Sequence, residues 1–170
     1  LFSNGYRYLN WLIDVPMLLL QILFVVEITR SERAKLRNQF FFSGSMMILT
    51  GYVGQFYENV NTSALMIWGA ISTLFFVHVL YLIWRLTQKS KSTLPQGAGK
   101  VIGSIWWLFF ISWMLYPGGY LMPVMINSAD GVVVRQVIYT IADISSKVIY
   151  GVLLGIAAQI RSDADGYKAE

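Results

Sequence analysis

Residues 132–160, VVVRQVIYTIADISSKVIYGVLLGIAAQI, form an apolar stretch long enough to cross a bilayer as one helix. Lys147 lies near its middle, roughly 18 Å along a helix from Arg135 and roughly 21 Å from Arg161. From that depth a lysine side chain reaches neither membrane surface, so its amine must be paired, neutral or used in chemistry. Asp143 lies one helical turn earlier on the same face and supplies a counter-charge.

Two interpretations of Lys147 follow from this placement. In the first, Lys147 and Asp143 form a structural ion pair inside the membrane. In the second, the amine of Lys147 forms a Schiff base with an aldehyde cofactor. The second interpretation requires a binding pocket beside the lysine.

The composition is that of an integral membrane protein. Of the 170 residues, 56% are hydrophobic and 13% are charged, whereas about 25% are charged in soluble domains. The chain has no cysteine and one histidine, which excludes thiolate chemistry and an ordinary zinc site. The net charge of +4 comes from basic residues in short connections between apolar spans, so we do not expect nucleic-acid binding.

Apolar length predicts an all-α membrane protein with a single transmembrane domain over residues 1–170. Five spans are predicted, at residues 9–29, 40–57, 62–84, 101–124 and 132–160. Basic residues gather in the first and third connections, which the positive-inside rule places in the cytoplasm together with a polar tail at 161–170. The chain begins at Leu1 without a signal peptide, and we expect it to be a partial sequence.

A file of polar residues follows the first predicted span. Arg7, Asn10, Asp14 and Gln21 fall within a helical stripe about 60° wide that covers roughly 21 Å of the axis. Such a stripe must face the protein interior or water. Hydrogen bonding between helices would explain Asn10 or Gln21 alone, but ionisable groups at Arg7 and Asp14 favour a transport or proton-relay role.

Aromatic residues supply the second half of a candidate site. Trp11 flanks the polar file, and Trp113 and Tyr116 lie one turn apart beside Pro117 on the fourth predicted span. This arrangement suits a flat apolar ligand clamped between rings.

Three motifs carry a resemblance to a known family. They are RYLNW with its following proline at residues 7–16, WMLYP at 113–117 and DISSK at 143–147. Together they resemble the microbial, or type I, rhodopsins, seven-helix membrane proteins that bind retinal as a protonated Schiff base. The resemblance covers the whole chain and implies five transmembrane helices of a seven-helix retinal-binding bundle, the third to the seventh, with the first two missing.

The resemblance implies particular roles for particular residues. Lys147 would bind all-trans retinal, and Asp143 would be a counter-ion. The implied retinal pocket consists of Trp11, Met47, Gly51, Ser72, Trp113, Tyr116 and Pro117. The implied setting is a bacterial inner membrane, with membrane lipid and further copies of the chain as partners.

The triplet Asn10, Asp14 and Gln21 resembles that of the light-driven sodium-pump rhodopsins. In that group Asp14 would accept the Schiff-base proton, and Asn10 with Asp143 would hold sodium transiently. Arg7 would gate the outer side, and the residues lining or closing the exit would be Gln55, Glu58 and Arg135. Such a pump would move protons when sodium is absent.

The chemistry of this triplet is consistent with cation transport. A cation does not pass a positively charged Schiff base, so the proton must first leave to an acceptor, for which Asp14 is the candidate. Asn10 offers an oxygen ligand that does not compete for protons, and Gln21 is not a proton donor. The alternatives are an outward proton pump, a sensory photoreceptor and a non-photoactive membrane scaffold. None of these is an enzyme.

Overall fold

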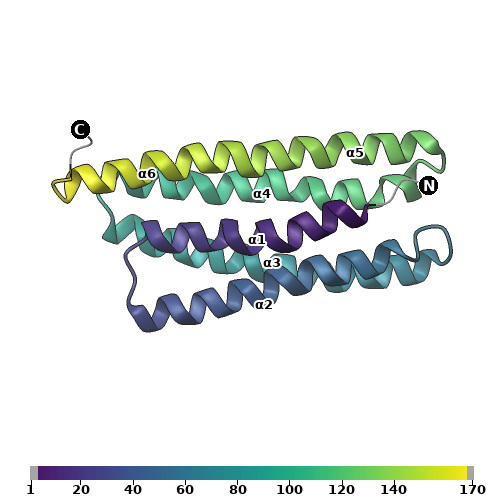
Figure 1. The fold of residues 1–170 in the computed structure, drawn as a ribbon, viewed down its shortest axis with the longest axis horizontal. Coiled ribbons are helices and arrows are strands. Elements are labelled where there is room, and N and C mark those ends of the chain that lie inside the picture. The colour runs from purple at the N-terminus through teal and green to yellow at the C-terminus, as the bar shows by residue number, and fades with distance from the viewer. Residues whose placement is uncertain (1–3, 168–170) are drawn as a thin grey trace.

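The computed structural model describes residues 4–167, which form five antiparallel helical rods (Figure 1). The rods are α1 (Gly5–Val25), α2 (Arg30–Gln55), α3 (Thr62–Thr93), α4 (Gln96–Met125) and a last rod of three consecutive helical parts. These parts are α5 (Ala129–Ile144), the π-helical turn η1 (Ser145–Ile149) and α6 (Tyr150–Ala164). The start of α1 and the α2–α3 and α4–α5 connections lie at one end, called here the N-terminal end of the bundle (Figure 1).

Short polar side chains define where three of the helices begin. Thr29 accepts a hydrogen bond from the backbone of Glu32 at the start of α2, Asn61 caps α3, and Ser128 caps α5. Each side chain satisfies a backbone N–H that the first helical turn leaves without a partner. The helices α3 and α4 extend beyond the predicted spans, and together they leave only residues 94–95 between them.

The predicted fold class needs correction. Four helical stretches of the described chain are long and apolar enough to cross a membrane, namely α1, α3, α4 and the last rod, whereas five spans were predicted. The exception is α2, whose first turns carry Arg30, Arg33, Lys35 and Arg37 and whose buried face is rich in small residues. The expected description of the chain as five helices of a seven-helix bundle also needs correction, because the described residues form a bundle of five rods.

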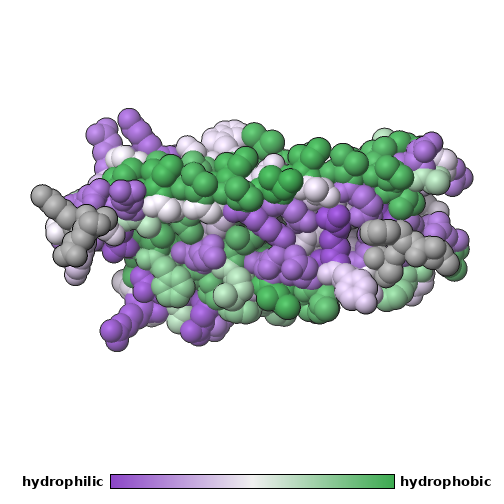
Figure 2. Space-filling model, turned by 45° about the horizontal axis from the view of Figure 1, so that its top comes forward, coloured by the Kyte–Doolittle hydropathy of each residue, from purple (hydrophilic) through white to green (hydrophobic). Residues whose placement is uncertain are grey.

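The outer surface of the bundle is largely apolar, as a lipid environment requires. Large hydrophobic side chains are exposed on several helices, including Phe24, Leu74 and Ile111. Figure 2 shows hydrophobic residues along much of one side of the molecule. Between its two ends, a helix satisfies its own backbone polar groups, so such faces are compatible with hydrocarbon. The chain is therefore a membrane protein.

The helix α1 lies against the last rod, and this contact positions the polar file. The Tyr150 hydroxyl donates to the carbonyl of Leu18 at 2.7 Å, and Arg161 donates to the carbonyl of Val25 at 2.6 Å. Arg161 thus belongs to α6, and helix continues through the first four residues of the predicted tail to Ala164. Residues 168–170 of that tail lie outside the described part.

Candidate functional site

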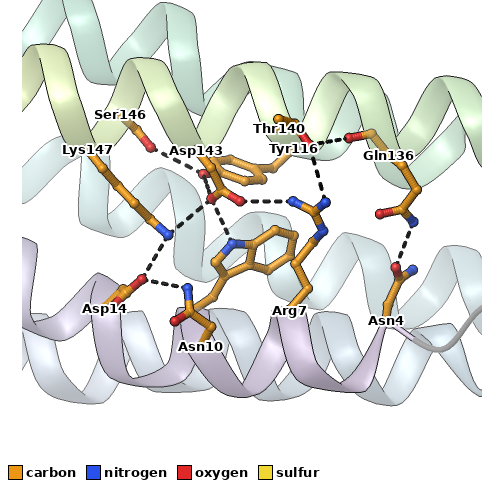
Figure 3. A network of polar contacts seen from close by, with 11 residues as sticks. Asn4, Arg7, Asn10, Asp14, Tyr116, Gln136, Thr140, Asp143, Ser146 and Lys147 are labelled. Atoms are coloured by element: carbon orange, nitrogen blue, oxygen red, sulfur yellow. Dashed lines mark hydrogen bonds and ion pairs between the residues drawn. The ribbon is translucent and has the colours of Figure 1, made fainter.

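Lys147 lies between two carboxylates that come from different rods (Figure 3). Its Nζ is 2.8 Å from Oδ2 of Asp14 on α1 and 3.3 Å from Oδ1 of Asp143 on α5. Lys147 occupies the middle of the π-helical turn η1, and such turns occur frequently at functional sites. The structure thus brings together the predicted lysine and its predicted neighbour Asp143, with Asp14 closer still.

Asp143 is the most highly coordinated group of the site. Its Oδ1 accepts hydrogen bonds from the indole of Trp11 at 2.8 Å and from the hydroxyl of Tyr116 at 2.9 Å. Its Oδ2 pairs with Nη1 of Arg7 at 3.0 Å. The Tyr116 hydroxyl also lies 3.2 Å from the hydroxyl of Ser146. These contacts hold the Asp143 carboxylate in one orientation beside Lys147.

The four charged groups form a balanced cluster that reaches the surface. Two cations, Arg7 and Lys147, alternate with two carboxylates, Asp14 and Asp143. Their side chains are 25%, 28%, 35% and 19% exposed, respectively. Figure 2 shows a hydrophilic band between hydrophobic regions on this side of the molecule. The lysine centre is therefore accessible from the flank between α1 and the last rod.

Three of the four residues in the predicted polar file belong to this network. Asn10 donates to Oδ2 of Asp14 at 2.6 Å, so one carboxylate oxygen receives both Asn10 and Lys147. Arg7 joins through Asp143. Gln21 is exposed on α1 and makes no side-chain hydrogen bond within residues 4–167. The structure does not bring Gln21 to the lysine centre.

The two residues predicted to hold sodium, Asn10 and Asp143, are connected only indirectly. Asn10 contacts Asp14, which pairs with Lys147, and Lys147 pairs with Asp143. Within residues 4–167, no group of three or more His, Cys, Asp and Glu side chains is arranged to hold a metal ion.

An apolar cavity of about 250 Å³ lies within the bundle beside this network. All seven residues of the predicted retinal pocket line it: Trp11, Met47, Gly51, Ser72, Trp113, Tyr116 and Pro117. Further lining residues that were not predicted include Tyr8, Phe76, Tyr120 and Tyr139. Trp113 is 3% exposed, and its ring stacks with that of Phe76 at a centroid distance of 6.4 Å.

Two cavity residues connect the cavity to the lysine centre. Trp11 and Tyr116 line the cavity, and their rings meet edge to face with centroids 5.0 Å apart. Both donate hydrogen bonds to Asp143, which pairs with Lys147. An aromatic, apolar chamber next to a lysine amine fits a flat apolar aldehyde such as retinal.

The predicted exit residues converge at the N-terminal end of the bundle. Arg135 on α5 forms an ion pair with Glu58, and its Nη1 donates to Gln55 Oε1 at 3.4 Å. The Arg135 and Glu58 side chains are 3% and 12% exposed. This pair is thus a buried ion pair that joins the α2–α3 connection to α5.

Two further residues of this region were not predicted. Gln136 donates a hydrogen bond to Asn4, and Asn4 donates to Gln55, which also accepts from Arg135. Asn4 lies three residues before Arg7, and Gln136 lies seven residues before Asp143. The same helical periodicity that identified the polar file, continued by one or two turns, would have found both.

The fold and the site define a class of protein: an α-helical membrane protein with a lysine between two carboxylates beside an aromatic cavity. The chain belongs to the bacteriorhodopsin-like protein family, whose model matches residues 2–160. Among relatives, the chain is 22% identical to a green-light absorbing proteorhodopsin of a gamma-proteobacterium, a match that covers 94% of this chain and 63% of that protein. It is 28% identical to bacteriorhodopsin of Halobacterium salinarum, over 94% of this chain and 58% of that protein.

Solved structures agree with this assignment. Xanthorhodopsin, described as a light-driven ion pump with a dual chromophore, superimposes with a TM-score of 0.87 and 32% sequence identity. The match covers 99% of this chain and 67% of that one. Thermophilic rhodopsin superimposes with a TM-score of 0.89 and 28% identity, over 98% of this chain and 67% of that one. The chain spans less than two thirds of the length of the proteorhodopsin and bacteriorhodopsin relatives.

Proposed function

We propose that the protein is a retinal-binding, light-driven pump that exports sodium and moves protons when sodium is absent. Retinal in the all-trans form, held as a Schiff base on Lys147, would supply light absorption and a light-driven change of shape. The aromatic cavity supports this proposal because its walls include Trp11, Trp113 and Tyr116. Membership of the bacteriorhodopsin-like family independently supports retinal binding and a light-driven activity.

The observation that carries the proposal is the shared oxygen of Asp14. Oδ2 of Asp14 lies 2.8 Å from Nζ of Lys147 and 2.6 Å from Nδ2 of Asn10. Asp14 is therefore positioned to accept a proton directly from the lysine nitrogen. A proton transferred there neutralises both groups and weakens the bond from Asn10, which releases Asn10 to turn its amide oxygen elsewhere.

Sodium is the ion that the protein is proposed to transport. Once Lys147 and Asp14 are neutral, the electrostatic barrier to a cation at the centre falls. The amide oxygen of Asn10 and the carboxylate of Asp143 then provide hard oxygen ligands, which sodium prefers. Gln21 offers no proton to return to Lys147, which disfavours a cycle that carries protons only.

The outward path follows the contacts of Arg7. Its guanidinium pairs with Asp143 and therefore stands between the lysine centre and the N-terminal end of the bundle. Arg7 acts as the gate on that side, and Gln55, Glu58 and Arg135 line and close the exit.

The proposed orientation places the N-terminal end of the bundle outside a bacterial inner membrane. The α1–α2 and α3–α4 connections and the end of α6 lie at the opposite end, and basic residues gather there (Figure 1). The positive-inside rule then makes that end, and the C-terminus, cytoplasmic. Membrane lipid and further copies of the chain are the proposed partners of the exposed apolar faces.

An outward proton pump is the second candidate function. The direct contact between Lys147 and Asp14 favours it, since it provides the proton acceptor that such a pump needs. The amide at Gln21, where a carboxylate donor would return the proton, argues against it.

Light-driven pH changes in cells that express the protein distinguish the two candidates. Cells supplied with retinal are illuminated in sodium chloride and in potassium chloride, with and without a protonophore. Sodium export predicts alkalinisation in sodium that the protonophore enhances, because protons then enter passively. Acidification in both salts that the protonophore abolishes would mean proton pumping, and Asn10 would lose its proposed role.

A further inference from the structure

Tyr150 joins the π-helical turn around Lys147 to α1. It is the first residue of α6, and its backbone N–H donates to the carbonyl of Lys147. Its hydroxyl donates to the carbonyl of Leu18 on α1 at 2.7 Å. The Tyr150 side chain is fully buried. One residue thus contacts both the backbone that carries the lysine and the helix that carries Asp14.

Two irregular places in the helices lie beside each other at this contact. Pro16 lies inside α1 and has no N–H to donate to the carbonyl of Leu12, which makes α1 easier to bend there. In the last rod, the turn η1 departs from regular α-helical hydrogen bonding. Asp14 precedes Pro16 by two residues, and Leu18 follows it by two. The last rod therefore contacts α1 on both sides of its proline, through the lysine before it and through Tyr150 after it.

The hydrogen bond of Tyr150 does not depend on the charges of the lysine centre. Nζ of Lys147 lies 2.8 Å from Oδ2 of Asp14, and transfer of a proton between them neutralises both groups and weakens their attraction. The bond from Tyr150 to Leu18 joins two neutral groups and is unaffected by this change. It therefore holds the part of α1 after Pro16 in place when the ion pair before Pro16 is lost.

The ring of Tyr150 connects this contact to the aromatic cavity. It packs against the ring of Phe109 on α4, with centroids 4.8 Å apart. Phe109 is fully buried and packs in turn against Trp113, with centroids 4.7 Å apart. Trp113 lines the cavity. A movement of Trp113 is therefore passed to Tyr150 through close-packed rings, because such an interior leaves little free space.

We propose that Tyr150 is a positioning residue for proton transfer from the nitrogen of Lys147 to Asp14. Its hydroxyl holds α1 against the π-helical turn beyond Pro16 and so keeps Asp14 within reach of the lysine. The inference rests on the proposed role of Asp14 as proton acceptor, which sodium export and proton export both use. Proton transfer requires close approach of the two groups, so loss of the hydroxyl slows it even though Tyr150 contacts neither reacting atom.

The first measurement compares Tyr150→Phe with the wild type. This substitution removes the hydroxyl and keeps the buried ring against Phe109. Tyr81→Phe makes the same change at an exposed tyrosine of α3 and is the matched control. Absorption changes after a light flash give the rate at which the lysine nitrogen of the retinal-loaded protein loses its proton. Thermal bleaching of the same samples measures the stability of the pigment.

The second measurement uses the protein without retinal. The chain has no cysteine, so two introduced cysteines carry spin labels at defined places. Phe24→Cys on α1 and Ile156→Cys on α6 are both at exposed positions, and both lie beyond the Tyr150 contact along their helices. Electron paramagnetic resonance gives the distribution of distances between the labels. It reports how firmly α1 is held to the last rod, with no contribution from pigment or transported ion.

We expect proton loss to slow by at least about tenfold in Tyr150→Phe and to stay within about twofold of the wild type in Tyr81→Phe. The label distances should spread over a wider range in Tyr150→Phe only. An unchanged rate of proton loss would overturn the proposal, even with faster bleaching, because Tyr150 would then only stabilise the packing. A slower rate with unchanged label distances would also overturn it.

Failure of the proposed function gives a different result. A wild type in which light moves no proton from the lysine nitrogen would refute the proposed pump itself. The label distances then decide alone whether Tyr150 holds α1 against the last rod. Equal distributions in Tyr150→Phe and Tyr81→Phe would contradict that role.

Discussion

Asp14 and Lys147 are 133 residues apart in the chain, yet Oδ2 of one lies 2.8 Å from Nζ of the other. The contact joins α1 to the π-helical turn of the last rod and leaves Asp143 as the second carboxylate, at 3.3 Å. Because Asn10 binds the same oxygen of Asp14, any change in the protonation of Asp14 also changes the hydrogen bond of Asn10. Proton acceptance and the orientation of a sodium ligand are thereby coupled at one atom.

Replacement of Asp14 by asparagine tests its role as proton acceptor. Asp14→Asn keeps the shape of the side chain but removes the basic oxygen beside Lys147, so we expect light-driven transport to fall by at least about 100-fold. The initial rate of transport in sodium chloride measures the effect. The control is Asp163→Asn, which replaces an exposed carboxylate in α6 by an amide and should leave the rate unchanged. Wild-type transport by Asp14→Asn would assign the proton to another acceptor.

Lys147→Arg separates the charge of the site from its chemistry. Arginine preserves a cation between Asp14 and Asp143, but its guanidinium remains protonated and does not form a Schiff base. We expect no visible pigment after retinal is added, although the protein is still inserted in the membrane. The absorption spectrum of the purified protein is the measurement. A visible pigment in this variant would place retinal on another residue, whereas Lys89→Arg, in the exposed pair with Glu32, should form pigment normally.

Gly51 tests how closely the cavity is packed. A Cβ atom at this position would lie 3.2 Å from Oγ of Ser72 and 3.5 Å from a ring carbon of Tyr8. Ser72 is held by its hydrogen bond to the carbonyl of Met47 at 2.7 Å, so it yields with difficulty. We expect Gly51→Ala to destabilise the pigment by about 1 kcal/mol, measured as faster thermal bleaching.

The control for this substitution is Gly151→Ala. A Cβ at Gly151, which is exposed on α6, has no neighbouring atom within 4 Å. Alanine there should leave bleaching unchanged or slow it, because alanine favours helix over glycine. Equal bleaching rates in the two variants would show that the wall of the cavity at Gly51 is not tightly packed.

Arg135 and Lys89 provide a matched pair of ion-pair deletions. Arg135→Gln leaves the buried carboxylate of Glu58 without its cation, which should cost about 3–5 kcal/mol of stability. Lys89→Gln breaks the exposed pair with Glu32 and should cost less than about 1 kcal/mol. Thermal unfolding of the solubilised proteins measures both. The double variant Arg135→Gln, Glu58→Gln should recover part of the loss, and a larger loss than in Arg135→Gln alone would contradict a simple ion pair.

Periodicity within a single helix was sufficient to predict much of the site. The four-residue spacing of Asp143 and Lys147 predicted their pairing, and the helical stripe on the first span predicted that Arg7, Asn10 and Asp14 act together. Gln21 lies on the same predicted stripe, but its side chain is exposed on α1 and stays outside the network.

Contacts between different helices could not be predicted from patterns within a single helix. The approach of Lys147 to Asp14 depends on how α1 lies against the last rod, which one sequence does not encode in any local spacing. The π-helical turn around Lys147 has no sequence signature of its own. The unpredicted cavity residues, such as Tyr8 and Phe76, look like ordinary membrane aromatics until the bundle is assembled.

The exception of α2 among the predicted spans has a compositional cause. Small and polar residues such as Ser43, Gly44 and Thr50 lie among the apolar residues of its later turns, so no stretch of 18 residues in α2 is apolar enough to be a candidate membrane span. The residues that the family resemblance assigns to a retinal pocket do lie together in the structure. All seven that were expected to form a retinal pocket line one cavity, although their spacing alone predicts no such grouping.

Light-driven release of radioactive sodium tests the central claim most directly. Vesicles are prepared with the retinal-loaded protein in the orientation that it has in cells. They are filled with labelled sodium chloride in the presence of a protonophore and then illuminated. We predict loss of label from the vesicles in the light only, abolished in Asp14→Asn and strongly reduced in Asn10→Ala. Label that stays in place under illumination, while the same vesicles without protonophore still change their internal pH, would contradict sodium transport and leave a proton pump.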